Sequence, residues 1–214
     1  MAERGDVTGR PEVVDAGQWQ RQRDELLAEE KRLTRELDAL AARRRRMPMV
    51  RFDADYVFEG HDGRQTMLDL FGEHRMLAVY QFMDVGPESF CPGCTYLTDN
   101  VTALERLADS DIAWATVSDM PLTQMTGYWR DRGWDVPYFS SRGTTFSADC
   151  GAGGGFLLSL FLRDGDEVFR TYSTTQRGVD RLLFANNIAD LAVFGRQQDW
   201  EDSPDGWPQS PTYG

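Results

Sequence analysis

The segment MLAVYQFMDVGPESFCPGCTYLTDN, residues 76–100, is the most informative stretch of the chain. It begins with the apolar run Met76–Met83, which is typical of a central strand buried on both faces. Apolar residues then recur at helical spacing, which predicts a helix over Cys94–Asp109. The motif Cys91-Pro92-Gly93-Cys94 therefore follows a predicted buried strand and lies at the start of a predicted helix.

This placement gives the two cysteines a chemical meaning. A helix start presents unpaired backbone N–H groups with a partial positive charge, and a thiolate there is stabilised. Cysteine pKa values fall in such places from about 8.5 into the range of roughly 3.5–7.5. Pro92 suits the first helical position, which needs no N–H donor. We expect Cys91 to be an exposed nucleophile and Cys94, one turn deeper, to resolve the mixed disulfide.

A zinc site and simple packing are the competing interpretations. Structural zinc usually takes four ligands, and a set of Cys91, Cys94, Cys150 and His74 is conceivable. For Cys150 itself, a second resolving thiol or a metal ligand competes with a small buried side chain, which we favour. A Cys-x-x-Cys motif beside a strand–helix unit is more typical of redox chemistry, so we predict no metal and no cofactor.

The rest of the chain alternates between strands and helices. Further strands are predicted at Val50–Phe58, Ile112–Val117, Pro137–Ser140, Phe156–Arg163 and Glu167–Ser173, the last two joined by a hairpin turn at Asp164-Gly165. Further helices are predicted at Pro121–Arg132 and Val179–Phe194. This order predicts an α/β fold with a mixed sheet and helices on both faces.

A long helix is predicted over Asp15–Met47, with Asp15 as its N-cap. Apolar residues recur along it every seven positions: Trp19, Leu26, Leu33, Leu40 and Met47. Such a seam packs either against the chain's own domain or against a second copy as a homodimer contact, and the heptads alone do not separate the two.

Beyond these patterns, the sequence resembles a known family. The stretches MPMVRFDADYVFEG, CPGCTYLTDN, VPYFSSRG and RDGDEVFRTYSTTQRG are similar to an uncharacterised bacterial thioredoxin-like family of predicted dithiol-disulfide oxidoreductases. The resemblance implies a thioredoxin-like fold in its peroxiredoxin-type extended form. Together with the residue patterns, it divides the chain into a disordered tail over 1–14, the long helix over 15–47, the thioredoxin-like domain over 48–196 and an acidic, Pro-rich tail over 197–214.

The resemblance leaves two other functions open. Pro87 and Cys94 match the peroxiredoxin pattern Pro-x3-Thr-x2-Cys, with Cys91 in place of Thr, and this implies a thiol peroxidase with Cys94 as the peroxide-reducing residue. Gly154-Gly155-Phe156 stands where thioredoxin-like proteins usually carry a cis-proline before the strand that faces the cysteines. A non-catalytic thioredoxin-like module for dimerisation or binding is the third interpretation.

Charge and composition limit the partners. The 214 residues carry a net charge of −12, which disfavours nucleic acid and anionic membranes as partners. Apolar runs are strand-sized and well short of the roughly 18 residues of a membrane span. Three cysteines are too few for a secreted disulfide framework, so we expect a cytoplasmic protein. The expected partners are a disulfide or peroxide substrate and an external thiol reductant.

Overall fold

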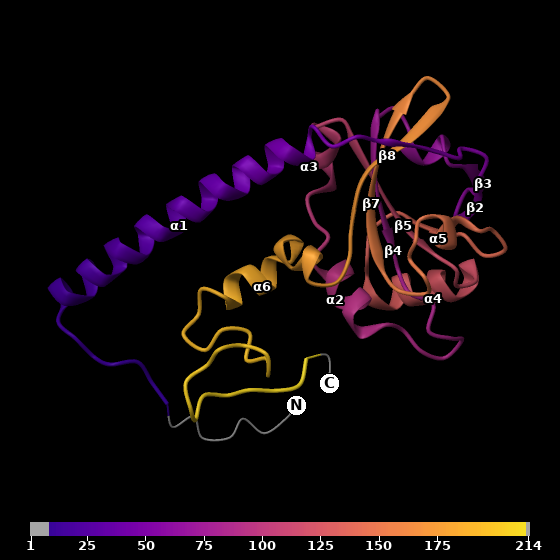
Figure 1. The fold of residues 1–214 in the computed structure, drawn as a ribbon. Helices are drawn as coiled ribbons and strands as arrows, with labels where there is room; N and C mark the ends of the chain where they lie inside the picture. The colour runs from indigo at the N-terminus through magenta and orange to yellow at the C-terminus, as the bar shows by residue number, and fades with distance from the viewer. Residues whose placement is uncertain (1–8, 213–214) are drawn as a thin grey trace. The chain divides into compact units, whose positions relative to one another are not determined.

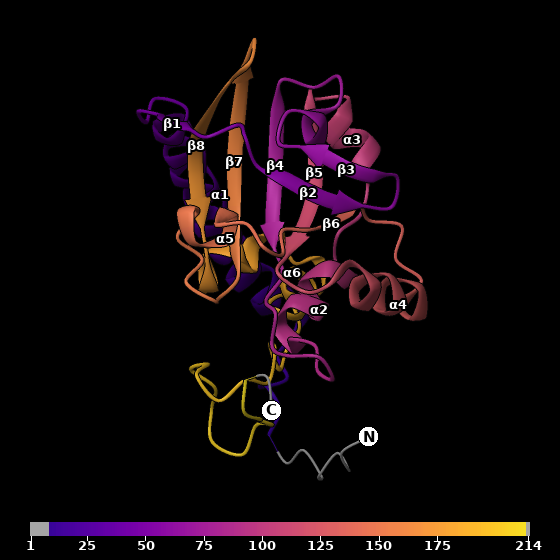
Figure 2. The same ribbon diagram turned by 90° about the vertical axis from the view of Figure 1, so that its right-hand side faces the viewer.

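The computed structural model describes residues 9–212, which form two compact units. The larger unit, Met49–Asn187, is built on one eight-stranded sheet. Its strands are β1 (Val50–Phe52), β2 (Val57–Gly60), β3 (Gly63–Thr66), β4 (Met76–Gln81), β5 (Ile112–Ser118), β6 (Tyr138–Ser140), β7 (Leu157–Asp164) and β8 (Glu167–Thr174). They lie in the order β1-β8-β7-β4-β5-β6-β2-β3 (Figures 1 and 2).

Strand β4 lies at the centre of this sheet (Figure 2). It runs parallel to β5 and antiparallel to β7, so backbone partners flank it on both sides. Successive side chains of a strand point to opposite faces. Leu77 and Val79 accordingly join one apolar cluster, whereas Ala78 and Tyr80 join another. The apolar run of the sequence, interrupted only by Gln81, is therefore the expected signature of a strand buried on both faces.

Helical elements lie between and after the strands of the sheet. They are η1 (Asp69–Phe71), α2 (Pro92–Asp99), α3 (Leu104–Ala108), α4 (Leu122–Arg132), α5 (Phe146–Asp149), η2 (Gln176–Leu182) and α6 (Phe184–Ala189). Residues of α2 and α4 pack on the face of Tyr80, and residues of η1 and α5 pack on the face of Val79. Together with the long N-terminal helix, this confirms the predicted thioredoxin-like α/β class with a mixed sheet and helices on both faces.

Several predicted boundaries are confirmed closely. Strands β7 and β8 form the expected hairpin, in which Gly165 adopts φ = 60°. Helix α4 ends at Gly133 with φ = 68°, a left-handed conformation that favours glycine. The predicted strand Val50–Phe58 is instead two strands far apart in the sheet: β1 is one edge strand, and β2 lies next to the opposite edge strand β3.

The single helix predicted over Cys94–Asp109 is wrong, because the chain forms α2 and α3 there. Asn100 caps α2: its side chain donates to the Tyr96 carbonyl and accepts the Ala185 N–H. Ala103 then adopts a left-handed φ of 54°. The apolar spacing continues across the break, so periodicity alone does not detect it.

The closing helix predicted over Val179–Phe194 is wrong as well. The chain forms η2 and α6, separated by Leu183 in an extended conformation. Leu183 is buried in the cluster that contains Tyr80. Burying this side chain interrupts the helical path, an example of tertiary packing overriding local propensity.

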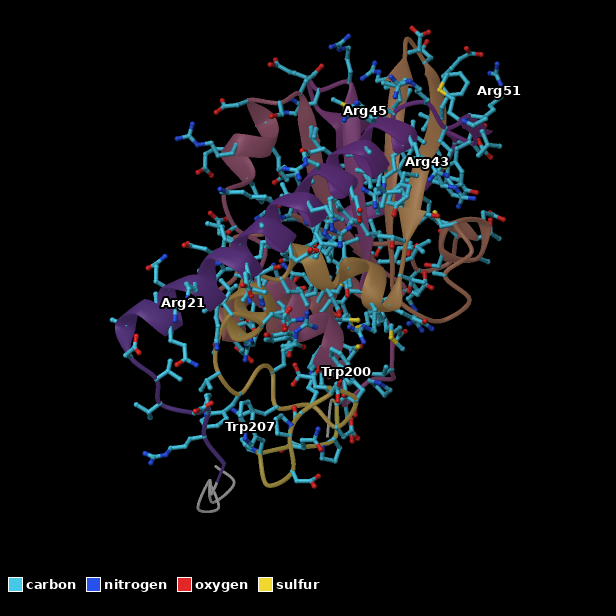
Figure 3. All side chains as sticks on the ribbon, turned by 60° about the vertical axis from the view of Figure 1, so that its left-hand side comes forward. Arg21, Arg43, Arg45, Arg51, Trp200 and Trp207 are labelled. Carbon is cyan, nitrogen blue, oxygen red and sulfur yellow. The ribbon has the colours of Figure 1, made fainter. Side chains whose placement is uncertain are left out.

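The smaller unit contains α1 (Ala16–Arg44) and the segment Ile188–Thr212. Asp15 caps α1 as predicted, accepting the Gln18 N–H at 2.8 Å. Arginines project at both ends of the helix, with Arg21 near its start and Arg43 near its end (Figure 3). The apolar seam residues Trp19, Leu26, Leu33 and Leu40 are 38–57% exposed.

The segment Ile188–Thr212 contains neither helix nor strand from residue 190 onward. Its turns are held by an ion pair between Arg196 and Asp190 and by an edge-to-face contact between Phe194 and Trp207, whose centroids are 5.3 Å apart. The expectations for residues 1–8 and 213–214 lie outside the described residues. Between residues 9 and 212, no helix combines the length and the apolar character needed to cross a bilayer.

Candidate active site at the start of helix α2

The predicted placement of the Cys91-Pro92-Gly93-Cys94 motif is correct. Helix α2 follows the carboxyl end of β4 (Figure 2), and Cys91 is its N-cap in an extended conformation. Pro92 occupies the first turn, where its missing N–H costs no hydrogen bond. The Sγ of Cys91 accepts the backbone N–H of Cys94 at 3.2 Å. A sulfur therefore takes the place that an Asp or Ser oxygen usually fills at a helix start.

Cys91 is less exposed than the sequence predicts. Cys91 is 8% exposed and Cys94 is fully buried, so the order of the two is as predicted but both lie inside the apolar cluster around Tyr80. Met83 contacts Cys91 directly, because its Sδ lies 3.6 Å from the Cys91 Sγ. The neighbouring Phe90 stacks on Tyr128, with ring centroids 3.6 Å apart and planes 2° apart.

The sulfur of Cys94 is held by three groups. The backbone N–H of Met83 donates to its Sγ at 3.4 Å. The buried Tyr80 hydroxyl also hydrogen-bonds to this sulfur, and the Cys94 thiol in turn donates to the sulfur of Cys91. All three cysteines of the chain are free, so the pair is in its reduced form.

These contacts separate the acidities of the two thiols. Donation from the Cys94 thiol, together with the N–H groups of Cys94 and Gly93, lowers the pKa of Cys91 to about 6, although burial opposes the shift. Cys94 donates its thiol proton in this hydrogen bond, so the bond favours the protonated form and raises the pKa of Cys94 far above its ordinary value. Burial of Cys94 raises its pKa further. At neutral pH the pair therefore holds one thiolate at Cys91 and one thiol at Cys94.

The other cysteine lies elsewhere. Cys150 follows α5 and belongs to the apolar cluster around Val79, on the opposite face of the sheet from Cys91. It is 3% exposed, and burial raises its pKa to about 12. This environment supports the buried-side-chain interpretation of Cys150 and separates it from the other two thiols.

The four-ligand zinc site considered from the sequence is not assembled. His74 follows η1 and faces Asp111, with 3.8 Å between its Nδ1 and a carboxylate oxygen. Within residues 9–212, no three side chains of the His, Cys, Asp and Glu types come together in a way that could hold a metal ion.

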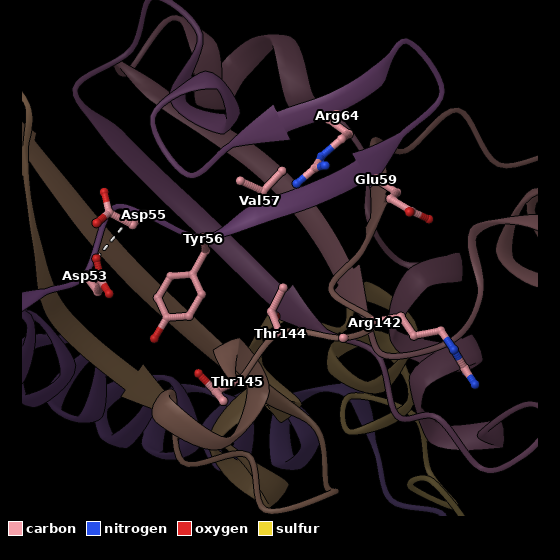
Figure 4. A pocket seen from close by; sticks show the side chains of 10 residues that line it. Asp53, Asp55, Tyr56, Val57, Glu59, Arg64, Arg142, Thr144 and Thr145 are labelled. Atoms are coloured by element: carbon pink, nitrogen blue, oxygen red, sulfur yellow. Dashed lines mark hydrogen bonds between the residues drawn. The ribbon is translucent and has the colours of Figure 1, made fainter.

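A surface hollow of about 590 Å³ has no cysteine among its lining residues (Figure 4). Carboxylates and guanidinium groups line it, including those of Asp53, Glu59 and Arg64. At its side, Tyr56 donates to Asp149 at 2.6 Å. Burial, followed by this bond, raises the pKa of Tyr56 to about 12, so the phenol stays protonated and serves a structural role.

Two residues that contact the cysteines could not be predicted from the sequence. Met83 and Tyr80 belong to the apolar run of β4 and the residues that follow it, and the run is fully explained by burial. The one available signal is the tyrosine itself, since a buried hydroxyl requires a partner. No spacing rule connects Met83 to a cysteine eight residues later.

Solved structures similar to this chain come from redox proteins. Peroxidoxin BcpB from Mycobacterium tuberculosis is 17% identical, with 64% of this chain and 95% of that chain covered and a TM-score of 0.44. A Xanthomonas campestris peroxiredoxin Q mutant is 18% identical, with 62% and 90% covered and a TM-score of 0.43. A secreted Mycobacterium tuberculosis disulfide oxidoreductase is 11% identical, with 61% and 96% covered and a TM-score of 0.38.

Curated proteins give no significant sequence match. One family model matches nearly the whole chain, over residues 8–213. This match agrees with the resemblance expected from the sequence motifs. The chain belongs to the family described as "Bacterial protein of unknown function (DUF899)".

Proposed function

We propose that the protein is a thiol–disulfide oxidoreductase in which Cys91 is the nucleophile and Cys94 the resolving thiol. The observation that carries this proposal is the hydrogen bond between the two thiols at the start of α2, which lowers the pKa of Cys91 to about 6. A thiolate is the reactive form of cysteine, and here it is populated at neutral pH.

The reaction follows thiol–disulfide exchange. The Cys91 thiolate attacks one sulfur of the substrate disulfide, forms a mixed disulfide and expels the other sulfur as a thiolate. Cys94 then loses its proton and attacks the sulfur of Cys91, which releases the second substrate thiol. The substrate gains two electrons from the protein and two protons, one from Cys94 and one from solvent, and the protein keeps a Cys91–Cys94 disulfide. An external thiol reductant returns the protein to its dithiol form.

The buried Tyr80 hydroxyl supports the second step. Once Cys91 is bonded to substrate it no longer accepts the Cys94 thiol, so the largest effect that raises the pKa of Cys94 is removed. The hydroxyl of Tyr80 and the N–H of Met83 then remain as donors to the Cys94 sulfur. Hydrogen bonds to the charged form favour that form, so both help Cys94 to ionise.

A single-turnover experiment tests the proposal. Reduced protein is mixed with an excess of a small aromatic disulfide, and released thiol and protein mass are measured. We expect two thiols per protein from the wild type, and one thiol with a retained adduct on Cys91 from Cys94→Ser. Cys150→Ser serves as the matched control and is expected to behave as the wild type. Thiol release by Cys91→Ser at the wild-type rate would refute the assignment.

The thiol peroxidase alternative places peroxide reduction at Cys94, and the geometry of that residue argues against it. A peroxide-reducing cysteine has to be an accessible thiolate. Cys94 is fully buried and its pKa is strongly raised. Peroxide consumption that survives Cys94→Ser would exclude this alternative, and its loss in Cys94→Ser with retention in Cys91→Ser would favour it.

We also propose that the exposed seam of α1 pairs with the same helix of a second copy. The seam has the seven-residue spacing of helix–helix contacts, and Leu26 and Leu33 are 57% and 48% exposed. A homodimer would cover these side chains without any role for the cysteines. We further propose that the thioredoxin-like domain spans residues 48–196, with a tail at each end of the chain. The proposed location is the cytoplasm, where thiols are kept reduced.

A further inference from the structure

Three sulfur atoms gather at the start of α2. The Sδ of Met83 lies 3.6 Å from the Sγ of Cys91, and the thiol of Cys94 donates a hydrogen bond to the same Sγ. The backbone N–H of Met83 donates to the Sγ of Cys94, so the residue that carries the thioether also contacts the second cysteine. We call Met83, Cys91 and Cys94 the sulfur triangle. The proposed thiol–disulfide exchange uses the two cysteine sulfurs and gives the thioether of Met83 no role.

The Met83–Cys91 edge of the sulfur triangle is close to the sulfur–sulfur spacing of a trigonal metal site. Metal–sulfur bonds of about 2.3 Å place the sulfurs of a trigonal site roughly 4 Å apart. The Met83–Cys91 edge is 3.6 Å, so it has to open by only a few tenths of an ångström. Methionine has three rotatable bonds and adapts readily to such a change.

The donor set selects the kind of ion. Thiolates and thioethers are soft ligands that select Cu(I), whereas a thioether binds hard or borderline cations poorly. Zinc in closed sites takes four ligands of the Cys, His, Asp or Glu types, and the described part of the chain gathers no three such residues. Three soft sulfurs in an apolar cluster match the preference of a soft monovalent cation.

We propose that the reduced protein binds one Cu(I) ion through the sulfur triangle. Cys91 is already a thiolate at neutral pH, so binding releases one proton, that of the Cys94 thiol. The two thiolates, the thioether and the cation then form a site with one net negative charge. No electron is transferred. The N–H groups of Cys94 and Met83 already point at the two cysteine sulfurs and offset that charge. Bound copper withholds both thiols from disulfide formation.

An anaerobic titration tests this inference. Reduced protein competes for Cu(I) with a coloured chelator such as bicinchoninate, and X-ray absorption counts the sulfur ligands. We expect one equivalent of copper with three sulfurs in the wild type, and two sulfurs in Met83→Leu. Losing an outer-shell partner typically weakens metal binding 10- to 100-fold, so losing this ligand should weaken it at least tenfold. Met83→Leu conserves volume and is expected to fold.

The matched control is Met67→Leu, which changes a buried methionine in the cluster on the opposite face. It is expected to bind copper as the wild type does. Wild-type affinity in Met83→Leu, or a wild-type site with two sulfurs, would overturn the role of the thioether. Failure of the wild type to retain copper would overturn the site altogether.

The copper site rests on the same two thiols as the proposed function but not on its redox step. Experiments can therefore refute either proposal without refuting the other. A protein that forms the Cys91–Cys94 disulfide but retains no Cu(I) loses only the copper site. A protein that retains Cu(I) through three sulfurs but never forms the disulfide loses only the oxidoreductase function.

Discussion

Replacing Cys94 with alanine should raise the pKa of Cys91. In the structure the Cys94 thiol is the largest contributor to the low pKa of Cys91, ahead of the N–H groups of Cys94 and Gly93. Those N–H groups belong to the backbone and stay in place in Cys94→Ala. The substitution therefore removes one donor and keeps the helix start intact.

The size of the effect follows from the strength of one charge-assisted hydrogen bond. Such bonds contribute about 1.5–3 kcal/mol, and one pKa unit corresponds to about 1.4 kcal/mol. Loss of the thiol donor should therefore move the pKa of Cys91 up by roughly 1–2 units. Starting from about 6, this brings Cys91 of the variant close to the ordinary cysteine value of about 8.5 without reaching it.

The assay is the pH dependence of alkylation of Cys91 by iodoacetamide, read together with the ultraviolet absorbance of the thiolate. In the wild type, reactivity should rise as pH increases through about 6, because the thiolate is the form that reacts. In Cys94→Ala the midpoint should lie higher, and in the control Cys150→Ala it should not move. A midpoint near 6 in Cys94→Ala would show that the backbone amides alone hold the thiolate.

Three further results are expected. Native reduced protein should be alkylated at Cys91 and spared at Cys150, whose burial raises its pKa to about 12; rapid labelling of Cys150 in peptide maps would contradict its burial. The pKa of Cys91 is depressed on folding, so the unfolded chain binds the extra proton between about pH 6 and 8.5 and stability should rise with pH there. Between pH 6 and pH 8 the free energy of unfolding, measured in denaturant titrations, should rise by about 2 kcal/mol more in the wild type than in Cys91→Ser. The same pH dependence of the unfolding free energy in both proteins would refute this prediction. Leu33→Glu places a charge in the α1 seam and should convert a dimer to a monomer in light scattering, whereas a wild type that is already monomeric would remove the dimer proposal.

The centre of the fold could be predicted from sequence because burial leaves a simple pattern there. Strands β4 and β5 are mostly apolar rather than alternating between apolar and polar residues, since each is covered on both faces. The β7–β8 hairpin is marked by its glycine turn, and α1 by its N-cap Asp15. In each case, residues close together in sequence determine the local structure.

Boundaries set by contacts distant in sequence could not be predicted. Asn100 ends α2 partly by accepting the N–H of Ala185, a bond across 85 positions. Leu183 breaks the last helical segment because its side chain packs into the cluster around Tyr80. Neither partner is visible from local periodicity.

The same distinction applies to the candidate site. The position of Cys91 and Cys94 at a helix start follows from the order of strand and helix, and the spacing of the motif gives their mutual contact. The burial of Cys91 and the approach of Met83 depend on how the chain returns from β4 to α2. A pattern of residue types identifies the candidate pair of cysteines, but the residues packed around that pair are determined by the tertiary structure.

The most direct test of the account is whether the two thiols form a bond with each other. Reduced wild-type protein is treated with a mild oxidant, and disulfide-linked peptides are identified by mass spectrometry alongside Cys94→Ser. The account predicts an intramolecular Cys91–Cys94 disulfide in the wild type and an adduct on Cys91 in the variant. A wild type in which both thiols stay free, or in which oxidation joins two chains and never these two residues, would contradict it.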